Sequence, residues 1–90
     1  MEISFTRHVL EKIKKHLHQL GISEDDIIDT IRKPDIIVYD TLENRYVALN
    51  YDKNLAVVYE KNDKIIVVTA IYSSKLRDLV ERRRRSGRWI

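Results

Sequence analysis

The stretch that decides the fold runs from Ile36 to Tyr72 and reads IIVYDTLENRYVALNYDKNLAVVYEKNDKIIVVTAIY. It holds four β-rich runs separated by short turn-type segments. The runs are Ile36–Leu42, Arg45–Tyr51, Leu55–Glu60 and Lys64–Tyr72. Connections this short allow only antiparallel neighbours, so the stretch predicts a β-meander. The last run is apolar on both faces, which predicts a central strand with Val67 in the core.

The residues before this stretch predict a short strand followed by a helical hairpin. The strand is expected at Glu2–Phe5. Thr6 is the expected N-cap of a first helix over residues 7–20, and Ser23 that of a second helix, which Pro34 ends. Apolar residues recur at helical spacing in both segments, so each helix has one apolar stripe to bury against the sheet.

The residues after the stretch predict a third helix with a basic tail. Ser73-Ser74 is the expected N-cap, the helix covers Lys75–Arg85, and Ser86-Gly87 ends it. The predicted order is β-α-α-β-β-β-β-α. The predicted fold class is α+β: a helical hairpin packed on one antiparallel sheet, with all helices on one side. We expect one domain over residues 1–90, in which residues 75–90 form the basic C-terminal helix and tail.

Length and composition exclude several classes of protein. Ninety residues leave room for one core, which is marginal at this size, so a homodimer or burial under a partner is expected. The chain has no cysteine, which excludes disulfides, a thiol nucleophile and a thiolate metal site. The N-terminus does not resemble a signal peptide and no apolar run is long enough to span a membrane. We therefore expect a cytoplasmic protein without a membrane partner.

Positive charge is concentrated at the C-terminus. Residues 75–90 carry seven Lys and Arg against two Asp and Glu, whereas residues 1–74 carry ten against twelve. Such a cluster predicts salt-dependent binding to a phosphate backbone. The alternatives are an acidic partner protein or a solvated helix face. Trp89 is expected either to stack on a base or to pack on the protein. The candidate nucleic-acid-binding residues are Arg77, Arg82, Arg83, Arg84, Arg85, Arg88 and Trp89.

Several local sequences, together with the order of elements, carry a resemblance to a known family. They are Phe5–His8, Gly21–Ile27, Ile31–Pro34, Arg45–Ala48 and Ile66–Tyr72. In these segments the chain resembles the RelE/BrnT-like superfamily of small toxins and their relatives. The resemblance implies a type II toxin, an RNA endonuclease that often acts on the ribosome. It also implies a cognate antitoxin that wraps the toxin and covers its basic surface.

Metal-independent RNA cleavage requires a base, a cation and an acid around one phosphate. His8 is the first candidate for the base, because the dipole of the first helical turn favours neutral imidazole; the alternative is that it caps or packs on the helix. Arg45 and Lys75 are candidates for the cation. Tyr72 is a candidate for base stacking or proton donation, or else a half-buried strand residue. The predicted site groups His8, Arg45, Tyr72 and Lys75 at the edge of the sheet.

No residue pattern points to a metal or a cofactor. His16 and His18 lack a metal-ligand spacing and are expected in solvent. Asp25-Asp26 is explained by helix capping, and the chain has no Gly-rich phosphate loop. Three hypotheses remain: a ribonuclease toxin, a non-catalytic nucleic-acid-binding module, and a protein-interaction domain for an acidic partner.

Overall fold

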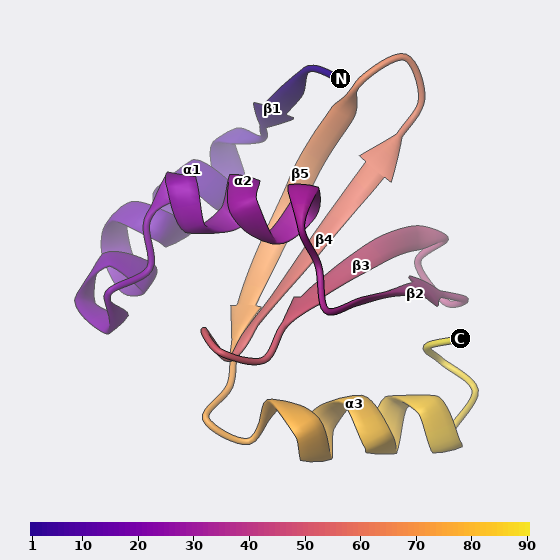
Figure 1. Ribbon diagram of the computed structural model, residues 1–90. Helices are drawn as coiled ribbons and strands as arrows, with labels where there is room; N and C mark the ends of the chain where they lie inside the picture. Colours follow the sequence, from indigo (N-terminus) through magenta and orange to yellow (C-terminus); the bar gives the residue numbers. More distant parts are fainter.

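The computed structural model describes the whole chain, residues 1–90, and shows an α+β protein with three helices and a five-stranded mixed sheet (Figure 1). The predicted α+β class is confirmed. The elements are β1 (Ile3–Phe5), α1 (Arg7–Lys12), the π-helical turn η1 (Ile13–Leu17), the 3-10 turn η2 (His18–Leu20), α2 (Glu24–Arg32), β2 (Ile36–Asp40), β3 (Arg45–Asn50), β4 (Leu55–Lys61), β5 (Ile65–Tyr72) and α3 (Leu76–Arg85).

The strand order is β1-β5-β4-β3-β2. Strands β2 to β5 form the predicted antiparallel meander. Strand β1, however, pairs in parallel with β5, with Phe5 opposite Val67, so the prediction of a purely antiparallel sheet is wrong. The physical reason is that no turn joins β1 to β5, and the rule for short connections does not apply to them.

The sheet has an apolar core on each face. The hairpin-side cluster consists of Val9, Ile13, Leu17, Ile22, Ile27, Ile31, Ala48, Leu55, Val57, Tyr59, Ile65, Val67 and Ala70. The α3-side cluster consists of Val38, Val47, Leu49, Ala56, Val58, Leu76, Val80 and Trp89. Successive strand residues point to opposite faces, so a strand such as β4, whose first five residues (Leu55–Tyr59) are all buried, needs cover on both faces. Helix α3 therefore lies on the face opposite α1 and α2 (Figure 1), and the prediction of helices on one side only is wrong.

The caps of the helical hairpin are as predicted. The Thr6 hydroxyl accepts a hydrogen bond from the Val9 N–H at 3.2 Å. The Ser23 hydroxyl accepts from the Asp26 N–H, and the Asp26 carboxylate accepts from the Ser23 N–H at 2.9 Å, which makes a capping box. The helical stretch from Arg7 to Leu20 is continuous, although it changes from α to π to 3-10 geometry along its length.

Strands β1, β3, β4 and β5 each differ from the predicted range by one residue at one end. Two further predictions, the N-cap of α3 and the end of β2, are wrong. Lys75, rather than Ser73 or Ser74, is the N-cap of α3, and it caps without a side-chain hydrogen bond. Strand β2 ends at Asp40 rather than at Leu42 because the Asp40 carboxylate accepts the next turn's backbone N–H groups at 2.9 Å. None of the helices has the length and apolar character needed to span a membrane.

Candidate nucleic-acid interface

Helix α3 carries the C-terminal positive charge on a rigid support. Leu76 and Val80 are 1% and 4% exposed and anchor one side of the helix in the α3-side cluster. The opposite side faces solvent, and no other helix covers this face of the sheet (Figure 1). The arginines of α3 are therefore presented from a fixed helix rather than from a loose tail.

The tail after α3 is tied to the edge strand β2 by a buried carboxylate. Asp40 is 4% exposed, and its carboxylate accepts from the Trp89 Nε1–H at 3.0 Å and from Arg88 Nε at 3.2 Å. The backbone adds two bonds: the Thr41 N–H donates to the Arg88 carbonyl at 2.8 Å, and the Ile90 N–H donates to the Tyr39 carbonyl at 3.0 Å. These contacts fix the C-terminal end of α3 against the sheet.

The same contacts lower the pKa of Asp40. Burial alone raises the pKa of this carboxyl, but the hydrogen bonds from the backbone of Glu43, the Trp89 indole and the backbone of Leu42, with the charge of Arg88, outweigh it. The pKa of Asp40 consequently lies below its usual 3.8, and the carboxylate is charged at neutral pH.

Three of the seven predicted nucleic-acid-binding residues hold this tail, and none of the three is fully exposed. Trp89 is 1% exposed, so it packs on the protein, one of the two expected alternatives, and its prediction as a base-stacking residue is wrong. Arg88 is engaged by Asp40. The guanidinium of Arg83 lies 5.4 Å from the centre of the Trp89 ring and is half-buried.

Four cations on α3 and its N-cap remain exposed and without an ion-pair partner: Lys75, Arg77, Arg82 and Arg84. Arg85, by contrast, pairs with Glu81 one helical turn earlier. The Arg77 guanidinium lies 4.0 Å above the ring of Tyr51, a cation–π contact that orients it. The unpaired cations are the groups free to meet an anionic partner.

The four residues predicted as catalytic do not gather in one place. Arg45 begins β3 and is held by Glu43 at 3.3 Å and Glu60 at 3.1 Å. Tyr72 ends β5 beside Leu55, which pairs with Asn50 at the other end of β3. The five residue steps from Arg45 to Asn50 span about 17 Å at ~3.3 Å per step. Arg45 and Tyr72 thus lie at opposite ends of the sheet.

The other two candidates lie on different sides of the sheet. His8 is exposed on α1, on the hairpin side, where the Tyr72 side chain also packs. Lys75 is the N-cap of α3, on the other side. A single phosphate contacted by all four groups is incompatible with this arrangement, since proton transfer requires hydrogen-bond contact or one bridging water.

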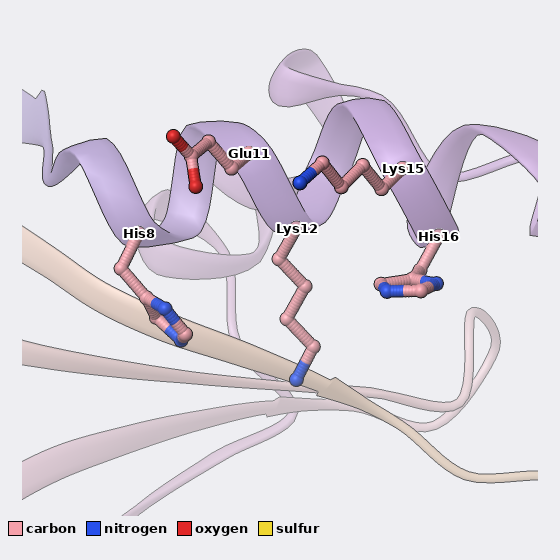
Figure 2. Close-up of a pocket in the computed structure, with 5 residues that line it drawn as sticks. All are labelled: His8, Glu11, Lys12, Lys15 and His16. Atoms are coloured by element: carbon pink, nitrogen blue, oxygen red, sulfur yellow. The ribbon is translucent and has the colours of Figure 1, made fainter.

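A hollow on the hairpin side is lined by α1 and η1 alone (Figure 2). Its residues are His8, Glu11, Lys12, Lys15 and His16. Figure 2 shows His8 and Lys12 extending from the same side of the helix. His16 and His18 are exposed, as predicted. No group of three or more His, Asp and Glu side chains is arranged to hold a metal ion. With one wall and no buried polar group, this hollow lacks the shape of an active site.

Two residues of the candidate interface, Asp40 and Tyr51, were not predicted from the sequence. Asp40 carried a signal, because it is a carboxylate at the end of the apolar run IIVY and such a group is buried only with partners. Tyr51 carried none, because its contact with Arg77 depends on which face of the sheet α3 covers.

We found no match to this chain among protein-family models, curated proteins or solved structures.

Proposed function

We propose that this protein is a nucleic-acid-binding module whose contact surface is the exposed side of α3. The observation that carries the proposal is the set of four unpaired cations at Lys75, Arg77, Arg82 and Arg84. Ion pairs occupy Arg85 on α3 and Arg88 after it, so the exposed and unpaired positive charge of the C-terminal region is confined to α3 and its N-cap. When such cations contact phosphates, counterions are released from the nucleic acid, and this release favours binding.

The resemblance to the RelE/BrnT-like superfamily suggests a more specific fold and partner. We propose a RelE-like arrangement for the strand, hairpin and meander, and RNA or the ribosome as the first partner to test. Endoribonuclease activity, a cognate antitoxin and a homodimer stay predictions. The cleavage hypothesis gains no support from the four residues predicted as catalytic. His8, Arg45, Tyr72 and Lys75 lie too far apart to act on one phosphate.

The test compares two sets of substitutions that remove the same charge from opposite faces. The first changes Lys75, Arg77, Arg82 and Arg84 to Ser. The control changes four exposed cations of the hairpin to Ser: Arg7, Lys14, Lys15 and Arg32. Binding to labelled RNA and DNA is measured over a range of salt concentrations, and gel analysis of the RNA detects cleavage.

We expect the α3 variant to lose affinity and to flatten the dependence of log K on log salt. Each lost phosphate contact lowers the slope by about 0.7 for single strands and about 0.9 for duplexes, so four contacts are worth about 3 to 4. The control should keep most of the wild-type slope. Equal losses in the two variants would mean that net charge alone drives binding. A wild type that binds neither RNA nor DNA would refute the proposal.

A further inference from the structure

The exposed side of α3 has a ridge along its middle and a hollow on each side. The ridge is the ion pair of Glu81 with Arg85, and both residues line both hollows. The first hollow adds two of the unpaired cations, Arg77 and Arg84, together with the ring of Tyr51. This hollow lies between α3 and the end of β3, where Tyr51 follows the strand.

The second hollow holds the other two unpaired cations. Lys75 and Arg82 line it with Asp78. In each hollow the two cations are seven positions apart, which is two helical turns or about 10.5 Å of rise. At the N-terminal end of α3, Lys75 also lines a smaller hollow with Arg77 and Tyr51. The exposed, unpaired charge of α3 therefore forms two rows that come together at its N-terminal end and are separated further along by a ridge of nearly balanced charge.

Two cationic rows flanking a ridge fit a ligand with two lines of phosphates. An α-helix with its side chains is about 10–12 Å across, and the major groove of B-form DNA is about 12 Å wide. A helix in that groove has one phosphate backbone on each side. A single strand has only one line of phosphates, and the major groove of A-form RNA is too narrow for side chains to read.

We propose that α3 enters the major groove of double-stranded DNA, with Arg77 and Arg84 facing the phosphates of one strand and Lys75 and Arg82 those of the other. The inference rests on the proposed function and specifies double-stranded DNA as the nucleic acid that is bound. The ridge then faces the base edges, where an arginine such as Arg85 binds guanine and a carboxylate such as Glu81 accepts from the cytosine amino group. No other helix lies on this face of the sheet to obstruct the approach (Figure 1).

The test treats the two rows separately. One double variant carries Arg77→Ser with Arg84→Ser, and a second carries Lys75→Ser with Arg82→Ser. The matched control carries Arg7→Ser with Lys14→Ser, which removes the same charge from the hairpin side. Each protein is titrated, at several salt concentrations, with four ligands of one sequence: a DNA duplex, an RNA duplex, a DNA single strand and an RNA single strand. All the substituted residues are exposed, and far-UV circular dichroism checks that each variant is folded.

We expect wild type to prefer the DNA duplex over the RNA duplex. Each α3 double variant should lower the salt slope for the DNA duplex by about 2, from two contacts at ~0.9 each, while the control leaves it unchanged. A slope that responds to only one of the two rows, or an RNA duplex bound as tightly as the DNA duplex, would overturn the inference and leave the proposed function intact. Failure of wild type to bind any of the four ligands would refute both.

Discussion

Removing the indole of Trp89 should destabilise the whole protein, although this residue is next to last in the sequence given. Its side chain is 1% exposed within the α3-side cluster and donates to a buried carboxylate. Truncating a buried Trp to Ala costs about 3–5 kcal/mol in transfer and cavity terms. Domains of this size are stable by only about 5–15 kcal/mol. We expect Trp89→Ala to lose about 3–5 kcal/mol of the free energy of unfolding.

The measurement is urea and thermal unfolding followed by far-UV circular dichroism, because the variant has no other tryptophan to serve as a fluorescent probe. A loss of this size lowers Tm by about 12 °C or more, at ~4 °C or more per kcal/mol. Trp89→Phe retains most of the buried ring and loses the hydrogen bond to Asp40, so it should lie between wild type and Trp89→Ala.

Ile90→Ala is the matched control. This neighbouring residue is 70% exposed, and its truncation should change stability by no more than about 0.5 kcal/mol. A loss below about 1 kcal/mol in Trp89→Ala, with an unchanged denaturant m-value, would refute the reasoning, since the tail would then contribute little to the core.

Three further perturbations test other parts of the fold. The folded-state pKa of Asp40 lies below 3.8, so the charged carboxylate stabilises the protein above that pH, and this stabilisation is lost as the pH falls through the folded-state pKa. Below about pH 3.8, Tm should therefore fall more steeply in wild type than in Asp40→Asn. Val67→Ala should lower the free energy of unfolding in urea by roughly 1–3 kcal/mol, because Val67 is 0% exposed. An unchanged urea midpoint would show that Val67 is not part of the core. Asp26→Ala removes one half of the capping box with Ser23 and should lose about 0.5–2 kcal/mol, whereas Asp25→Ala, which makes no such bond, serves as its control.

Local signals predicted the parts of this fold that depend on neighbours in sequence. The change from helical to strand periodicity at Pro34, the caps at Thr6 and Ser23, and the turns between strands are all set within a few residues. The meander follows from short turns, and the burial of Val67 follows from a run that is apolar on both faces.

The parts that were missed depend on residues far apart in sequence. No short motif specifies that β1 pairs in parallel with β5. Nor does any short motif specify which face of the sheet α3 covers. The candidate interface shows the same limit. The arginine run was visible, but its division into paired and unpaired cations depends on Glu81, Asp40 and Trp89 after folding.

The pairing of β1 with β5 also has a consequence for the order of folding. Thr6 and Val68, which are 62 positions apart, are joined by a hydrogen bond where the two strands meet. Closing a loop of this length carries an entropy cost that the meander strands avoid, because short turns bring them together. The meander should therefore form before β1 docks. Contacts formed after the rate-limiting step affect mainly the unfolding rate, so Phe5→Ala should speed unfolding in a stopped-flow chevron and leave the folding arm unchanged.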